Sequence, residues 1–147
     1  MEYFALYDTV RTYCETNNIK FLAGDAFYIN AEASNFDYED DQLVLTMDVA
    51  AKPTFSIGNK ISDVTYTGLV MLGRKFETLD NTTASLDEKF MQKYDNRLKD
   101  LAQLLIVHIT TIACANELEI GALDMRYALN KFDTNIDFIA GTISLIQ

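Results

Sequence analysis

SLDEKFMQKYDNRLKDLAQLLIVHITTIACAN, residues Ser85 to Asn116, decides the fold of this 147-residue chain. The Ser85 hydroxyl can accept from the backbone N–H of Glu88, and the Glu88 side chain can reach back to the Ser85 N–H. This arrangement is a capping box, which begins a helix. The helix is expected to run from Leu86 to about Asn116, because apolar residues then recur three or four positions apart, at Phe90, Tyr94, Leu98, Leu101, Leu105, Ile109 and Ile112. From Leu101 to Ala115 the sequence is apolar nearly all round, so we expect this half to be buried on more than one side, in the core or against another subunit.

Two strands are predicted to follow the helix, from Leu118 to Leu129 and from Asn135 to Gln147. Lys131-Phe132-Asp133-Thr134 has the composition of the turn between them, and Gly121 and Gly141 are candidate bulges. Both faces of the last strand are partly apolar, as in a strand that is covered on each side. The helix and the two strands together predict a sheet packed against a helix.

The preceding half of the chain predicts a first helix over residues 2–17, which Asn17-Asn18 ends. Residues 26–29 are a candidate short strand, and alternation from Gln42 to Ala50 predicts a strand with one buried face. Pro53 is interpreted as a break. Val64 to Phe76, rich in Val, Thr and Tyr, predicts a further strand.

These elements predict an α+β fold, with an N-terminal helix and an antiparallel sheet of four or five strands packed against a long helix. Hydrophobic residues make up 49% of the chain and charged residues 23%, which suits a folded core. The single proline and six glycines leave no composition typical of a linker, so we expect one domain over residues 1–147. The N-terminus has no signal-peptide pattern and no apolar run is long enough for a membrane span, so a cytosolic compartment is expected.

The formal net charge is −10, and it is unevenly distributed. Residues 1–41 carry a balance of −7 and residues 117–147 a balance of −3, whereas residues 42–116 are neutral. An acidic surface repels phosphate backbones, so we expect no specific nucleic-acid binding. Cys14 and Cys114 both fall on apolar helix faces, and we interpret them as buried free thiols.

The chemistry-bearing residues predict no catalytic, cofactor or metal site. His108 is the only histidine, lies in an apolar segment and is interpreted as a core or interface histidine with a hydrogen-bonded ring. Asp133 begins a stretch that resembles a calcium loop, but Phe138 and Ser144 stand where such a loop requires glycine and glutamate. The dense acidic segment Asp37, Glu39, Asp40 and Asp41 is interpreted as a solvated loop, and as our candidate for a partner-facing or lumen-facing contact.

The order of elements resembles the tail-terminator and related neck-ring proteins of tailed bacteriophages. The resemblance covers a little over half the chain and depends on Thr65 to Gly73, the capped helix, and the ending from Arg126 through Asp133 to Leu145. It implies a structural virion protein, not an enzyme, assembled in the host cytoplasm. Copies would form a ring of about six or twelve that joins the portal or head to the tail, contacts other neck or tail proteins, and lets DNA pass through an acidic lumen.

Two other classes of function stay open at this point. An acidic interaction domain, or an inhibitor that mimics DNA in the basic groove of a nucleic-acid enzyme, would also be acidic, although the predicted long helix is electrically balanced. A small α+β enzyme or ligand-binding domain would use a pocket between helix and sheet. Competition with DNA would identify the mimic, and stabilisation by small metabolites or metals would identify the third class.

Overall fold

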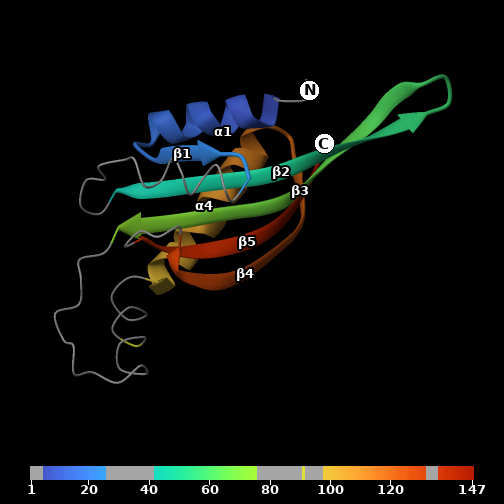
Figure 1. The fold of residues 1–147 in the computed structure, drawn as a ribbon. Helices are drawn as coiled ribbons and strands as arrows, with labels where there is room; N and C mark the ends of the chain where they lie inside the picture. Colours follow the sequence, from blue (N-terminus) through green and yellow to red (C-terminus); the bar gives the residue numbers. More distant parts are fainter. Residues whose placement is uncertain (1–4, 26–41, 76–90, 92–97, 132–135) are drawn as a thin grey trace.

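The computed structural model describes residues 5–25, 42–75, 91, 98–131 and 136–147 (Figure 1). A five-stranded sheet has the order β1-β2-β3-β5-β4, which confirms the predicted α+β fold class. The elements, in chain order, are α1 (Ala5–Thr16), β1 (Lys20–Ala23), β2 (Leu43–Ser56), β3 (Lys60–Lys75), α4 (Lys99–Ala115), β4 (Glu119–Lys131) and β5 (Ile136–Ile146).

The sheet is antiparallel except at one edge, where β1 pairs with β2 in parallel over only four residues, Lys20 to Ala23. Sequence reasoning did not identify β1, because so short a strand shows no clear alternation. The candidate strand at 26–29 lies outside the described residues, as do the capping box at Ser85 and the turn residues 132–134. Because β1 pairs with β2 in parallel, the sheet is mixed, whereas the sequence predicted an antiparallel sheet.

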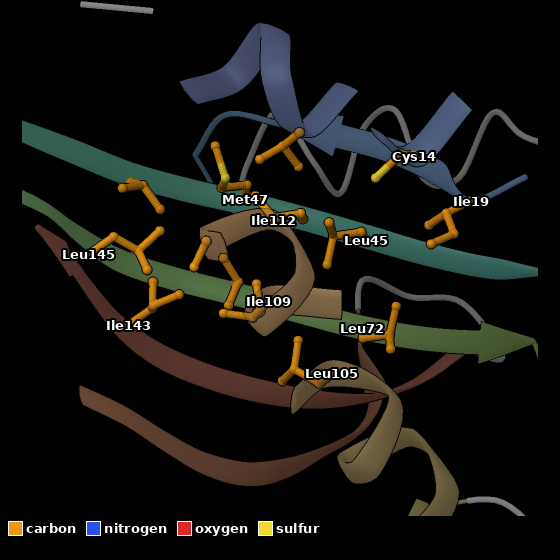
Figure 2. Close-up of a cluster of buried hydrophobic side chains, with 14 of the residues drawn as sticks. Cys14, Ile19, Leu45, Met47, Leu72, Leu105, Ile109, Ile112, Ile143 and Leu145 are labelled. Atoms are coloured by element: carbon orange, nitrogen blue, oxygen red, sulfur yellow. The ribbon is translucent and has the colours of Figure 1, made fainter. Parts of the chain in front are cut away.

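Both helices pack on the same face of this sheet. Figure 2 shows Leu105, Ile109 and Ile112 of α4 directed toward side chains of β2, β3 and β5, with Cys14 of α1 next to Ile19 at the edge of the same cluster. Burying a large aliphatic side chain of this kind contributes about 1.5–3 kcal/mol. The shared core consists of buried apolar residues from α1, α4 and the strands, among them Leu6, Val10, Cys14, Leu45, Met47, Leu72, Leu101, Leu105, Ile109, Ile112, Ile139, Ile143 and Leu145.

A second apolar cluster lies on the opposite face of the sheet. Val44, Met71, Phe138 and Ala140 belong to it, and each is almost fully buried. The two clusters confirm the prediction that β5 is buried on both faces, since Phe138 and Ile139 are adjacent and point in opposite directions. Predicted strands from Leu118 and from Asn135 correspond to β4 and β5 within one or two residues.

The two helices end in the same way. Asn18 and Glu117 have φ of 55° and 54°, and the next residue donates its backbone N–H to a carbonyl five positions back, Ile19 to Cys14 at 2.8 Å and Leu118 to Ala113 at 2.9 Å. Ile19 and Leu118 are then buried, as is common for the apolar residue after a left-handed helix cap. This geometry confirms that Asn17-Asn18 ends the first helix.

Two predictions about irregularities in the strands were wrong. Pro53 does not end its strand: β2 continues to Ser56, and Pro53 is paired with Val64. Because β1 reaches only as far as Met47, one edge of β2 has no described neighbour at Pro53, and a missing N–H there costs no ladder hydrogen bond. Gly121 does lie at a bulge, but the register is regular at Gly141, where the absence of a side chain instead makes room for Leu123 and Leu105.

Candidate functional site

The β2–β3 hairpin extends beyond the rest of the sheet (Figure 1). The pairing of β3 with β5 stops at Thr65, whereas the pairing of β2 with β3 continues to Ser56 and Lys60. We call residues 52–64 the arm. Sequence reasoning missed the arm because it ended the strand at Pro53; the Gly58-Asn59 pair, typical of a turn, was the available signal.

Hydrogen bonds within the arm fix its conformation. The backbone N–H of Asn59 donates to the carbonyl of Ser56 at 3.2 Å, and Gly58 and Asn59 both have positive φ, a conformation that glycine and asparagine adopt readily in turns. The Ser56 hydroxyl donates to the carbonyl of Lys60 at 3.1 Å, and the Ser62 hydroxyl to that of Thr54 at 3.0 Å. The arm is therefore a hairpin with a defined, hydrogen-bonded conformation.

The arm exposes its large apolar side chains. Phe55 and Ile61 are direct cross-strand partners and are 59% and 60% exposed, and Ile57 in the turn is fully exposed. Cross-strand partners point to the same face of a hairpin, so Phe55 and Ile61 form one apolar pair. Isolated exposed apolar residues are ordinary on a protein surface, but a paired cluster at the end of a projecting hairpin is typical of a contact site.

A second exposed apolar group lies beside α4, and we call Ile106, Met125 and Tyr127 the β4-side patch. Met125 and Tyr127 pair with Gly141 and Ile139, which face α4, so these two side chains lie on the α4 side of the edge strand β4. Ile106 follows the buried Leu105 by one helical step of 100°, toward the flank of α4 away from α1. These three side chains are 37%, 39% and 41% exposed.

The opposite flank of α4 contacts α1 through a polar pair. A hydrogen bond of 2.6 Å joins the Tyr13 hydroxyl to Nδ1 of His108, and the rings meet edge to face at 5.7 Å. His108 Nε2 is buried without a hydrogen-bond partner among the described residues, and burial lowers the pKa of His108. The hydrogen bond confirms that the ring of His108 is bonded, as predicted, and it places His108 where α4 contacts α1.

The two cysteines differ from each other. Cys14 is fully buried in the core, and desolvation raises the pKa of its thiol to about 12. Cys114 is exposed, which corrects the prediction that both thiols are buried. The error has a geometric cause, because position 114 lies half a helical turn from the sheet-facing side defined by Leu105 and Ile112.

The acidic residues predicted to face a lumen or a partner, Asp37, Glu39, Asp40 and Asp41, lie outside the described residues, so that assignment stays a prediction. Among the residues that the structure describes, no three His, Cys, Asp or Glu side chains gather as a metal site would require. No helix in the described ranges is long and apolar enough to cross a bilayer. Comparison of the chain with protein-family models, with curated proteins and with solved structures gave no match.

Proposed function

We propose that this protein is a structural subunit that assembles with copies of itself into a ring, in the neck or tail terminator of a tailed-phage virion. The observation that carries the proposal is the arm, a hairpin that leaves the sheet and exposes the paired side chains Phe55 and Ile61. A projecting element of this kind contributes little to the core of its own chain. Its apolar side chains are suited to burial against another molecule.

The β4-side patch supports the same proposal. The arm and the patch are two different apolar surfaces on one chain, and subunits that contact each other through two different surfaces join head to tail. Head-to-tail contacts that close generate rings. In the proposal the ring contains about six or twelve copies, as the resemblance implies. The resemblance of the element order to that of tail-terminator and neck-ring proteins is consistent with this arrangement.

The charge of the chain fits the proposed passage of DNA. A net charge of −10 disfavours tight binding of a phosphate backbone, so a channel lined by this protein would not hold the genome. In the proposal Asp37, Glu39, Asp40 and Asp41 face that channel or a neighbouring neck or tail protein. The protein acts by surface complementarity and needs no cofactor.

Native mass spectrometry tests the proposal, with protein concentration raised stepwise at near-physiological salt. A single closed species of fixed copy number, which grows at the expense of monomer, is the expected result. Negative-stain images of that species should show a ring with a central opening. A protein that stays monomeric throughout, and instead displaces DNA from a basic enzyme in a one-to-one complex, would contradict the proposal and favour a DNA mimic.

A further inference from the structure

We propose that the arm of one copy docks on the β4-side patch of a second copy, with Phe55, Ile57 and Ile61 covering Ile106, Met125 and Tyr127. This inference rests on the proposed function and specifies the contact between subunits. Four features of the chain carry it: the face on which the arm's apolar pair lies, the bulge that puts it there, the charge of the arm, and the positions of the two surfaces.

The apolar face of the arm continues the core face of the sheet. Along β2, Leu45, Met47 and Val49 are buried beneath the helices, and Ala51 packs against the same core. Alternation places Phe55 on this face too, beyond the reach of α1 and α4. The core face of β2 and the apolar face of the arm therefore form one continuous surface, which α1 and α4 cover only in part.

A bulge puts Ile61 on that face. Asp63 is paired with Thr54 and Ile61 with Phe55, so Ser62 is the extra residue. Without the extra residue, alternation from the core-facing Val64 would direct Ile61 to the opposite face. A bulge changes the face to which the following side chains point. Here it places Ile61 beside Phe55, and the two form an apolar pair that a partner can cover.

Charge favours a second copy of this chain as that partner. The arm carries Lys52 and Lys60 against Asp63, all exposed, whereas the rest of the chain carries 21 of the 22 acidic residues. Two acidic bodies repel each other, and the arm is the part that can approach without that penalty. The arm has a formal charge of +1 and the rest of the chain a formal charge of −11, so the arm is attracted to the body of another copy.

The two surfaces are placed for a head-to-tail contact. The arm leaves the sheet where Thr65 pairs with Ile146, and Ile146 also pairs with Glu119 at the start of β4. Met125 lies six residues farther along β4, about 20 Å from the base of the arm and in the opposite direction. An arm that points away from its own patch can reach only the patch of another copy.

A mixing experiment tests this contact. The double variant Phe55→Ser/Ile61→Ser disables the arm, and the double variant Ile106→Ser/Met125→Ser disables the patch. Val107→Ser is the control, because Val107 is an exposed apolar residue of α4 that points away from the patch. Circular dichroism and thermal unfolding establish that each variant is folded. Each double variant alone is expected to associate at least about 100-fold more weakly than the native protein, and the control within about twofold.

The mixture of the two double variants gives the decisive result. Each retains the half that the other has lost, so an equimolar mixture should form a one-to-one dimer that extends no further. If the arm variant still forms native rings, the arm contact is wrong while the proposed function stands. If the native protein forms no oligomer at any concentration, both fail.

Photo-crosslinking locates the contact independently of stability. Ile57→benzoylphenylalanine places a photoreactive group at a fully exposed position, and ¹⁴N- and ¹⁵N-labelled chains are mixed before irradiation. Mixed-isotope links between position 57 and peptides within residues 99–128 are the expected products. Links confined to one chain, or directed to α1 and β1 of the neighbour, would overturn the inference.

Discussion

Gly73→Ala tests the packing on the face of the sheet opposite the helices. Gly73 of β3 pairs directly with Phe138 of β5, and a methyl group on Gly73 would lie 2.5 and 2.8 Å from two carbons of the Phe138 ring and closer still to a third, Cδ1. Carbon atoms in contact are normally about 3.5–4.0 Å apart. The ring would have to move by about 1 Å, and at 1% exposure it has almost no free space.

Overpacking of this kind costs about 1–3 kcal/mol. For a domain of this size that lowers the melting temperature by roughly 2–4 °C per kcal/mol, and it lowers the urea midpoint without changing the slope of the transition. Gly121→Ala is the matched control, because its methyl group would meet Ser144 Oγ at an ordinary 3.4 Å. We expect the control to stay within about 0.5 kcal/mol of the native protein.

A double-mutant cycle with Phe138→Leu separates a clash from a general loss of stability. The smaller side chain should recover part of the Gly73→Ala cost, so the two free energies of unfolding should not add. An unchanged urea midpoint for Gly73→Ala would refute the reasoning. Strict additivity in the cycle would do the same, because it would mean that the methyl group and the ring do not meet.

Three further predictions concern α1 and α4. Tyr7→Phe should lower stability by about 1–3 kcal/mol in urea unfolding, since the Tyr7 hydroxyl donates to the Val49 carbonyl at 2.6 Å and accepts from its N–H at 3.1 Å; an unchanged midpoint would show that water replaces both bonds. Burial lowers the pKa of His108, so the unfolded chain binds more protons than the folded chain. Stability should therefore decline as pH falls from 7.5 through the unfolded pKa near 6.5, and His108→Gln should reduce this decline. An identical decline in that variant would refute the assignment of the pH dependence to His108. A thiol reagent at pH 8 should label Cys114 rapidly and Cys14 only on unfolding, as mass spectrometry of the labelled peptides would show; equal labelling of both thiols in the folded protein would contradict the burial of Cys14.

The fold could be predicted where the apolar pattern was long and regular. The described part of α4, together with β4 and β5, follows directly from spacing, because each element buries one or two defined faces over eleven or more residues. The strand β1 has only four residues, and its parallel pairing depends on contacts distant in sequence. Pro53 was misread because its effect depends on whether a neighbouring strand is present, which the local sequence does not specify.

The candidate site could not be predicted in the same way. Phe55 and Ile61 continue the alternation of a core strand, and the sequence does not indicate where the covering helices stop. The bulge at Ser62 likewise arises from pairing between strands. Charge instead suggested Asp37, Glu39, Asp40 and Asp41, for which the described structure supplies no contacts, so their role in a lumen or partner contact remains a prediction.

Cryo-electron microscopy of the assembled protein tests the central claim most directly. The account predicts a closed ring in which every arm lies across α4 and β4 of the neighbouring copy, with Phe55 and Ile61 buried. Well-dispersed monomers at high concentration would contradict it, and so would a symmetric dimer that leaves both arms in solvent.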